Sequence, residues 1–220
     1  MGDHVTLEVD RGVGVIRLDR PPANAIDLQM ATELGDTIEE ADEREDVGAI
    51  VLWGGERIFA AGADIKAMVE WGPDEVRPSV DALGAACDLL ERIGTVSIAA
   101  VNGYALGGGL ELALGADLRY LGDDATVGQP EIRIGVIPGA GGTQRLTRLI
   151  GPGRAKQMLF TGDTISGELA LAWGLVNRVV APDALDAAVD ELARLIASKS
   201  SMAIASGKRV FYQQLDLGVA

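Results

Sequence analysis

The feature that most constrains the fold is a group of glycines between two apolar segments. Residues 97–101 form an apolar run typical of a buried strand, and residues 110–116 have the composition of a buried helix. Gly107, Gly108 and Gly109 stand between them; glycine permits the positive φ angles of a sharp strand-to-helix turn and lets a ligand approach the backbone. Glu111 falls at the start of the predicted helix, where backbone N–H groups are free. This arrangement suits a reaction in which charge builds on a carbonyl oxygen while a carboxylate moves a proton beside it.

This stretch is consistent with two other interpretations. In the first, the glycines only form a tight turn between a core strand and a core helix, and Glu111 is an ordinary acidic residue near a helix start. In the second, residues 96–116 span a membrane, because they hold a single charged residue and a Gly-x-x-x-Gly pattern. Asn102, Glu111 and the central glycines argue against a membrane span. A second turn and a second carboxylate, elsewhere in the chain, favour a functional site over a purely structural turn.

The second turn lies upstream. Residues 49–53 form an all-apolar strand, and the small residues after it lead into a predicted helix start at Asp64. Two strand-turn-helix junctions of this kind can present their N–H groups to one oxygen atom, although Asp64 is also consistent with a simple N-cap. Downstream, Glu131 stands in a glycine- and proline-rich segment, residues 129–145, among apolar residues that tend to raise its pKa. A carboxyl group with a raised pKa is a useful acid.

Composition restricts the available chemistry. His4 is the only histidine and Cys87 the only cysteine, which excludes a Ser-His-Asp triad, a histidine-built zinc site and an internal disulfide. Proton transfer then falls to carboxylates, Lys or Tyr. The net charge is −14, and no Lys/Arg cluster is long enough to follow a nucleic acid backbone. We expect no nucleic acid partner, no membrane association, no metal or redox cofactor, and a reducing, cytoplasmic location.

The order of predicted elements indicates an α/β fold. Residues 5–9 and 13–18 predict a hairpin, and alternating helices and strands follow it. The predicted helices cover residues 28–44, 80–93, 110–116, 143–150, 154–161, 166–173 and 185–199, and the further strands cover residues 49–53, 97–101, 117–121, 125–128 and 176–180. Another helix begins at Ser201. We expect an α/β catalytic core over residues 1–180 and the start of a helical C-terminal region over residues 181–220.

The motifs together resemble the enoyl-CoA hydratase/isomerase, or crotonase, family, and within it the enoyl-CoA hydratases. The resemblance runs from about Val5 to Val180. The matching segments, in chain order, are residues 59–66 (Phe-Ala-Ala-Gly-Ala-Asp-Ile-Lys), 102–111 (Asn-Gly-Tyr-Ala-Leu-Gly-Gly-Gly-Leu-Glu), 129–131 (Gln-Pro-Glu), 137–145 (Ile-Pro-Gly-Ala-Gly-Gly-Thr-Gln-Arg) and 173–176 (Trp-Gly-Leu-Val). Each motif alone has little specificity, whereas all five in this order are specific.

The resemblance implies a spiral of strand-strand-helix units with a helical C-terminal part, assembled into trimers or dimers of trimers. It assigns the oxyanion hole to the backbone N–H groups of Ala63 and Gly108, which would hold the thioester oxygen of an acyl-CoA. The coenzyme A moiety would lie against residues of the first matching segment, with two residues of an upstream loop at its border. These residues are Ala61, Asp64, Ile65 and Lys66 in the segment, and Ala23 and Asn24 in the loop.

Glu111 and Glu131 would then flank a water molecule over the 2,3 double bond of the substrate, which requires no cofactor. Our leading hypothesis is hydration of trans-2-enoyl-CoA, with Glu111 as base and Glu131 as acid; the two roles can be exchanged, because neighbouring carboxylates titrate as a pair. An enoyl-CoA isomerase of the same fold and a non-catalytic acyl-CoA-binding protein are the alternatives. The argument for the non-catalytic alternative is the C-terminal part, which we expect to be shorter than is usual in the family.

The resemblance does not determine the length of the acyl chain. Met68, Val69 and Trp71 follow the first matching segment, and we expect them to shape the acyl pocket, although a packing or surface role fits them equally well.

Overall fold

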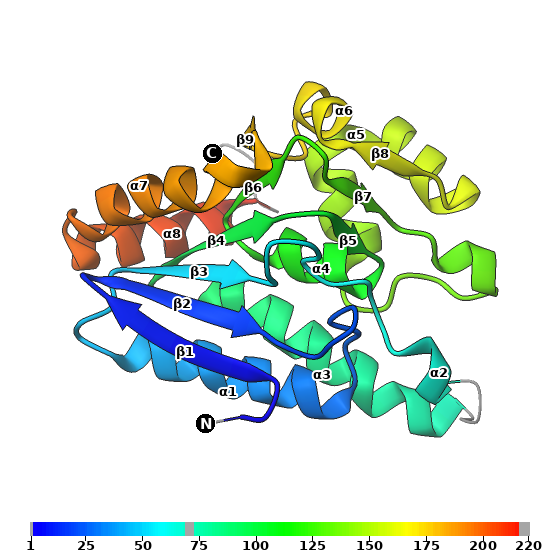
Figure 1. Ribbon diagram of the computed structural model, residues 1–220, viewed down its shortest axis with the longest axis horizontal. Coiled ribbons are helices and arrows are strands. Elements are labelled where there is room, and N and C mark those ends of the chain that lie inside the picture. The colour runs from blue at the N-terminus through cyan, green and yellow to red at the C-terminus, as the bar shows by residue number, and fades with distance from the viewer. Residues whose placement is uncertain (1, 69–72, 216–220) are drawn as a thin grey trace.

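The structure is a computed structural model that describes residues 2–68 and 73–215 (Figure 1). Its elements, in chain order, are β1 (Val5–Asp10), β2 (Val13–Leu18), α1 (Leu28–Glu43), β3 (Ala49–Trp53), α2 (Ile65–Met68), α3 (Pro73–Arg92), β4 (Val96–Val101), β5 (Tyr104–Leu106), α4 (Gly108–Gly115), β6 (Leu118–Gly122), β7 (Thr126–Gly128), η1 (Glu131–Ile134), α5 (Gly142–Thr161), β8 (Thr164–Ser166), α6 (Gly167–Trp173), β9 (Arg178–Val180), η2 (Pro182–Ala184), α7 (Leu185–Ala197) and α8 (Ser201–Gln214).

The main sheet has six strands in the order β1-β2-β3-β4-β6-β9. The predicted hairpin is confirmed: β1 and β2 pair antiparallel, and the turn between them has positive φ angles at Arg11 (46°) and Gly12 (88°), as a two-residue hairpin of this twist requires. The other neighbouring strands in this sheet run parallel. The carboxyl ends of β3 and β4 therefore lie at the same edge, and the two glycine-containing junctions begin there.

Strand β3 shows why its sequence is apolar throughout. Ile50 and Leu52 belong to the core on the side of α1 and α3, whereas Ala49 and Val51 belong to the core that includes α7. Successive side chains of a strand point to opposite faces, so a strand covered on both faces needs apolar residues at every position. Figure 1 shows α1 and α3 on one side of the sheet and α7 and α8 on the other.

The glycine-rich turn is more elaborate than the predicted strand, turn and helix. Residues 104–106 form an additional strand, β5, which pairs with β7 in a second sheet of order β5-β7-β8. Helix α4 then begins at Gly108 rather than Leu110, and Glu111 remains in its first turn. Residues 96–116 thus form two strands and a short helix. Within the described residues, no helix has the length and apolar character needed to cross a bilayer.

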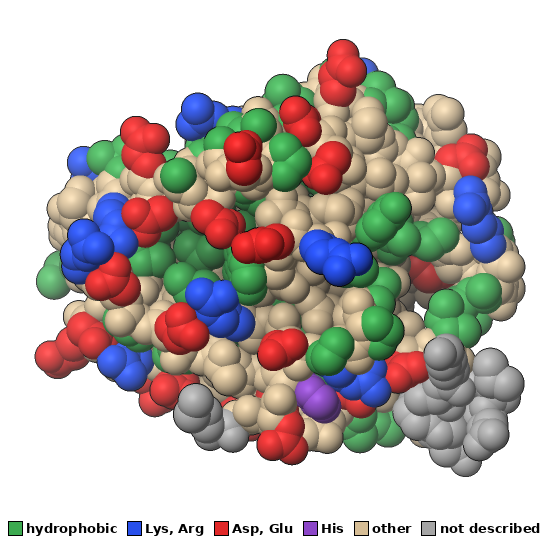
Figure 2. Space-filling view, viewed as in Figure 1, with side chains coloured by type: hydrophobic (Ala, Val, Ile, Leu, Met, Phe, Trp, Pro, Cys, Tyr) green, Lys and Arg blue, Asp and Glu red, His purple; other side chains and the backbone are tan. Residues whose placement is uncertain are grey.

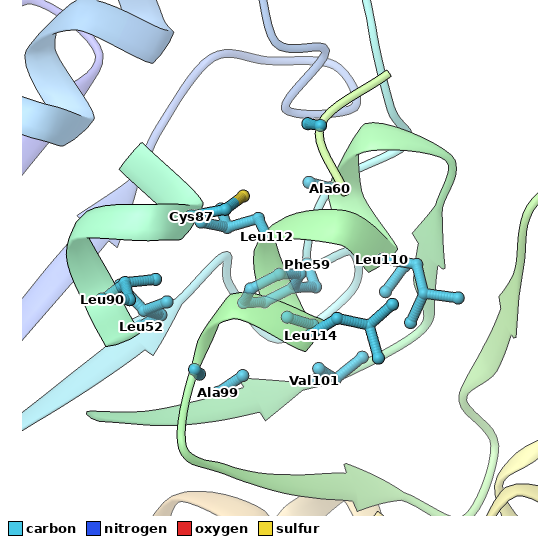
Figure 3. Close-up of a cluster of buried hydrophobic side chains, with 14 of the residues drawn as sticks. Leu52, Phe59, Ala60, Cys87, Leu90, Ala99, Val101, Leu110, Leu112 and Leu114 are labelled. Atoms are coloured by element: carbon cyan, nitrogen blue, oxygen red, sulfur yellow. The ribbon is translucent and has the colours of Figure 1, made fainter. Parts of the chain in front are cut away.

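Helix α4 is the centre of the main core. All of its residues are buried, and Leu110, Leu112 and Leu114 are at most 4% exposed. Figure 3 shows these leucines around Phe59, with Val101 of β4 and Leu90 of α3 close by. A helix that is apolar on all sides is stable only when it is surrounded by protein. The position of Glu111 is therefore set by the packing of the whole core.

Two helices differ from their predicted bounds. Helix α3 begins at Pro73 rather than Val80, because proline is well tolerated in the first turn of a helix, where its missing N–H would have no partner. Residues 142–161 form one element, α5, but Gly151 has non-helical angles (φ 79°, ψ 160°) and precedes Pro152. The chain therefore bends between the two helices that were predicted there.

The C-terminal region packs on the main sheet. Leu185, Val189 and Ala193 of α7 are buried against β2, β3 and β4. Helix α8 is fastened by Lys208, whose Nζ donates hydrogen bonds to the carbonyl oxygens of Leu90 and Thr95 and to Asp117. The region from residue 181 to 215 therefore shares its core with the preceding part. Figure 2 shows that Lys and Arg side chains on one face are interspersed with Asp and Glu.

Candidate active site

A cavity of ≈ 310 Å³ lies where the two glycine-containing junctions meet α3 and η1. Its lining is mainly apolar, and its polar side chains include the two predicted glutamates. The lining residues are Ile26, Asp27, Ala61, Gly62, Ala63, Asp64, Ile65, Met68, Val76, Ser79, Val80, Leu83, Gly107, Gly108, Glu111, Pro130, Glu131, Arg133, Ile134, Val136, Ile137, Gly139 and Ala140. Met68 lines the cavity, and its role in shaping an acyl pocket stays a prediction; Val69 and Trp71 lie outside the described residues.

We call residues 60–65 the first junction and residues 105–109 the second junction. Ala60 and Ala105 form an isolated parallel bridge, and the N–H of Leu106 donates to the Ala60 carbonyl at 3.1 Å. Gly62 (φ 104°) and Gly107 (φ 51°) both have positive φ angles. A Cβ on Gly62 would stand 2.8 Å from the Leu106 carbonyl oxygen, so a side chain at this position would push the junctions apart. The structure thus brings both junctions together, as the sequence predicts.

The backbone N–H groups of Ala63 and Gly108 lie close together at the cavity. A Cβ added to Gly108 would be 3.6 Å from the Ala63 nitrogen. Ile26 holds the backbone on both sides of Ala63, because its N–H donates to the Gly62 carbonyl and its carbonyl accepts from Asp64 N. Among the described residues, no hydrogen bond uses the N–H of Ala63 or of Gly108. Two unused donors that line one cavity are what an oxyanion hole requires.

Glu111 is 3% exposed, and its carboxylate is held by the backbone of the loop before α5. Its Oε1 accepts hydrogen bonds from the N–H groups of Ala140 and Gly142, both at 2.7 Å. Burial raises the pKa of Glu111 above the ordinary value, and the two N–H donors oppose that rise. The geometry fixes the orientation of the carboxylate and favours its ionised form locally.

Glu131 is the first residue of the short helix η1 and is less deeply buried than Glu111. Burial, together with the negative charge of Glu111, raises the pKa of Glu131 to about 7. A carboxyl group with a pKa near neutrality exists in both protonation states under working conditions, which suits an acid or a base. The sequence predicted both the elevated pKa and its cause.

Gln129 is a polar residue of the site to which the sequence analysis gave no role. Its side chain is fully buried beside Glu131. With its amide oriented to donate, Nε2 lies 2.6 Å from Oε1 and 3.1 Å from Oε2 of Glu131. A buried amide that donates to a carboxylate orients it and offsets part of the cost of its charge. The adjacent Gln-Pro-Glu motif was a signal, but the sequence does not show which way the amide points.

The predicted coenzyme A residues of the first junction are arranged along the cavity wall. Ala61, Asp64 and Ile65 line the cavity, whereas the side chain of Lys66 lies outside the described part of the chain. Asp64 Oδ2 is 2.9 Å from Arg20 Nη2, which also contacts Asp27. The carboxylate of Asp64 is therefore in an ion pair. A role in binding coenzyme A stays a prediction for all four residues.

Ala23 and Asn24 are not among the residues that line the cavity. Ala23 supports the first junction, because its carbonyl accepts from Ala61 N at 3.0 Å. Asn24 (φ 49°) turns its side chain inward, where Nδ2 donates to the carbonyl oxygens of Gly54 and Phe59 at 2.7 and 3.0 Å. These contacts give both residues a structural task in shaping the first junction. A contact with coenzyme A stays a prediction.

The described residues contain no group of three or more His, Cys, Asp or Glu side chains arranged to hold a metal ion. The groups at and beside the cavity include the carboxylates of Glu111 and Glu131, the buried amide of Gln129 and the backbone donors of Ala63 and Gly108. Such a site can polarise a carbonyl oxygen and move protons beside it.

The chain belongs to the enoyl-CoA hydratase/isomerase family. The sequence profile of that family, described as "Enoyl-CoA hydratase/isomerase", matches residues 8–219. Individual relatives agree with this assignment. A short-chain-enoyl-CoA hydratase of Clostridium acetobutylicum is 40% identical over 222 residues, which cover 99% of this chain and 85% of the relative. A crotonyl-CoA hydratase of Syntrophomonas wolfei is 41% identical over 209 residues, covering 94% of this chain and 80% of the relative.

Solved structures confirm the fold. The crystal structure of an enoyl-CoA hydratase from Bacillus anthracis superposes with a TM-score of 0.95 at 36% identity, over 98% of this chain and 85% of that one. An enoyl-CoA hydratase subunit from Geobacillus kaustophilus gives a TM-score of 0.92 at 42% identity, over 99% and 84%. The predicted α/β fold of the crotonase type is therefore confirmed, as is the resemblance on which it rested.

Proposed function

We propose that this protein hydrates trans-2-enoyl-CoA to 3-hydroxyacyl-CoA. The observation that carries the proposal is that Glu111, Glu131 and the unused N–H groups of Ala63 and Gly108 all line one mainly apolar cavity. The relatives named as short-chain-enoyl-CoA and crotonyl-CoA hydratases support the same reaction and favour a short acyl chain.

The oxyanion hole would activate the substrate. When the thioester oxygen accepts hydrogen bonds from Ala63 N and Gly108 N, electron density moves from the conjugated double bond toward that oxygen, and carbon 3 becomes electrophilic. Because the N–H groups are already in place, they stabilise the developing enolate without reorganisation. Removal of one such donor typically lowers the rate roughly 100- to 1000-fold.

The two glutamates would divide the proton transfers between them. Glu111, ionised and held by two N–H groups, accepts a proton from water as the water oxygen bonds to carbon 3. Glu131, which has a pKa of about 7, donates its proton to carbon 2 as the enolate collapses. Water is thereby added across the double bond, and a proton passes from Glu111 back to Glu131 through solvent to reset the site. The opposite assignment of acid and base gives the same product and stays open.

Substrate binding would use the surface beside the first junction. We propose that the coenzyme A moiety lies along Ala61, Asp64, Ile65 and Lys66, because the family resemblance implies this segment and its first three residues line the cavity beside Ala63. The acyl chain would enter the apolar part formed by α3 and η1. Assembly into trimers or dimers of trimers stays a prediction from the family resemblance.

The test follows the absorbance of the conjugated enoyl thioester when the purified protein is mixed with crotonyl-CoA. We expect the wild type to remove this absorbance and Glu111→Gln and Glu131→Gln each to lower kcat about 100- to 10,000-fold, because each replaces a positioned acid or base. Glu168→Gln is the matched control, since Glu168 is exposed on α6, away from the cavity. Wild-type rates in both site variants would contradict the mechanism.

A second readout separates hydration from the alternatives. Reaction in water enriched in oxygen-18 should place the label on carbon 3 of the product. Conversion of a 3-enoyl thioester without label would instead indicate an isomerase. Acyl-CoA binding by calorimetry, without turnover of any enoyl thioester, would indicate a non-catalytic binding protein.

A further inference from the structure

Arg145 is a buried charged residue in the first turn of α5, behind the loop that holds Glu111. It is 8% exposed, and its guanidinium donates in three directions. Nε donates to Glu91 and Nη2 to Asp88, both on α3, while Nη1 donates to the Ala140 carbonyl at 2.9 Å. A planar fork of donors can hold three acceptors at fixed angles, which a lysine ammonium on a flexible stem does not reproduce.

The Ala140 carbonyl, which accepts a hydrogen bond from Arg145, connects this arginine to the carboxylate of Glu111. Ala140 donates its N–H to Glu111 while its carbonyl accepts from Arg145, so the residue is held from both sides. The next peptide unit is held as well, because the Gly141 carbonyl accepts from the backbone N–H of Arg145 at 2.9 Å. That peptide unit carries the Gly142 N–H, the second donor to Glu111. Arg145 therefore contacts both peptide units of the loop between Ala140 and Gly142.

Gly141 makes this contact possible. Its φ angle is 101°, and a Cβ at this position would lie 2.0 Å from Arg145 Nη1. Any side chain there would occupy the place of the guanidinium. Gly141 and Arg145 thus act together, and neither takes part in the proton transfers of the proposed reaction.

The charge of Arg145 acts in the same direction as its hydrogen bonds. Among the described residues, the titratable groups that act on Glu111 are Cys87 on α3, Glu131 on η1 and Arg145 on α5, and of these three Arg145 is the cation. Asp88 and Glu91 on α3 pair with Arg145, and Asp27, Asp64 and Arg133 also line the cavity. The positive charge of Arg145 lowers the pKa of Glu111 and opposes the effect of burial.

We propose that Arg145 is a positioning residue for Glu111: it clamps the loop from Ala140 to Gly142 so that both N–H groups point at one carboxylate oxygen. The catalytic consequence rests on the proposed hydration. The structural consequence, a carboxylate held in one orientation beside a positive charge that lowers its pKa, does not depend on any reaction.

The experiment compares Arg145→Gln and Arg145→Lys with wild type and with Lys156→Gln, which alters an exposed lysine of the same helix. In Arg145→Gln we expect kcat for crotonyl-CoA hydration to fall about 10- to 100-fold, as for a misplaced catalytic group, with KM nearly unchanged. The acid limb of the pH profile of kcat should move to higher pH. Arg145→Lys keeps the charge, so its acid limb should stay near the wild-type position while kcat remains reduced.

A second measurement needs no turnover. Carbon-13 NMR of labelled glutamate carboxyl groups, with the Glu111 signal assigned through Glu111→Gln, follows the pKa of Glu111 in the free protein. We expect it to rise in Arg145→Gln and to stay in place in Lys156→Gln. If Arg145→Gln does not fold, Arg145→Lys serves in its place, with the expected result of a lowered kcat at an unchanged Glu111 pKa.

Folded Arg145→Gln with an unchanged Glu111 titration and an unchanged acid limb would overturn the proposal, as would wild-type kcat in both variants. A wild type without hydratase activity would instead count against the proposed function, and the NMR titration would still decide the role of Arg145.

Discussion

The first and second junctions meet at the same cavity, but very different amounts of protein surround them. The second junction leads into α4, which is buried along its whole length among the leucines of the main core. The first junction leads into the four-residue helix α2, and Ala61, Ala63 and Ile65 are exposed. Both offer a backbone donor, and the second junction leads directly to Glu111 in the first turn of α4, the carboxylate proposed to be catalytic.

This difference indicates that the two junctions have different tasks. A group whose pKa must be shifted needs a low-dielectric surrounding and a fixed position, which the core around α4 provides for Glu111 and for the adjacent Glu131. A segment that meets a large, mostly solvated substrate has to stay at the surface, and it is held by ion pairs and backbone hydrogen bonds instead. Each junction should therefore respond to a different kind of substitution.

The largest effect on the free energy of unfolding is expected where the two junctions touch. A Cβ on Gly109 would lie 2.2 Å from the Ala60 carbonyl oxygen, so Gly109→Ala has to separate the two junctions. We expect a loss of about 3 kcal/mol in the free energy of unfolding, at the upper end of overpacking effects. That loss should lower Tm by about 6–12 °C in a domain of this size.

Gly35→Ala is the matched control, because a Cβ at that position of α1 meets nothing within 4 Å. The same substitution should there stabilise the protein by about 0.5–1 kcal/mol, since alanine is the better helix former. Differential scanning calorimetry of both variants gives the comparison. Equal Tm values for Gly109→Ala and wild type would show that the contact between the junctions is not tight.

The sequence predicted the parts of the fold that local patterns determine. The turn at Arg11 and Gly12 specified the hairpin, and the all-apolar composition of β3 specified a strand covered on both faces. The α/β class came from the order of the predicted elements, whereas the crotonase type and the meeting of Glu111 and Glu131 at one cavity came from the family resemblance. Strand β5 was missed because Tyr104, Ala105 and Leu106 form a strand only through their pairing with β7.

The sequence also did not predict the contacts made by the side chains that support the site. Gln129 and Arg145 lie in two of the matching segments and Asn24 lies in a loop, but none of these patterns shows which groups their side chains contact. Which way an amide or a guanidinium points depends on the packing of several elements, which no local spacing records. Asn24 shows the consequence: its side chain holds the backbone at Gly54 and Phe59, before the first junction, a contact that the sequence did not predict, whereas its place beside coenzyme A stays a prediction.

An effect of intermediate size on the free energy of unfolding is expected at Glu131, beside the buried second junction. A carboxyl group whose folded pKa is raised from 4.5 to about 7 binds more protons in the folded than in the unfolded state between these values. Folding stability contributed by this group is therefore lost as pH rises from 4.5 to 7. After allowance for the partial exposure of the side chain, the loss should be about 1–2 kcal/mol.

Glu131→Gln cannot ionise and should escape this loss. Urea unfolding of wild type and variant at pH 5 and pH 8 measures it: the variant should gain stability relative to wild type at pH 8. Glu168→Gln, on the exposed face of α6, should show no such pH-dependent gain. A gain of the same size at both pH values would mean that the cavity does not penalise the charge of Glu131.

The smallest effect is expected from the exposed side, at the ion pairs of the first junction. Arg20 is 24% exposed and reaches Asp64 and Asp27 at 2.9 Å. Arg44 pairs with Asp46 at 2.8 Å on the open surface. Arg20→Gln should cost about 1 kcal/mol in the free energy of unfolding, because it leaves two half-buried carboxylates close together, whereas Arg44→Gln should cost about 0–0.5 kcal/mol. Urea unfolding at low salt measures both, and equal costs would mean that the first junction is held by its backbone alone.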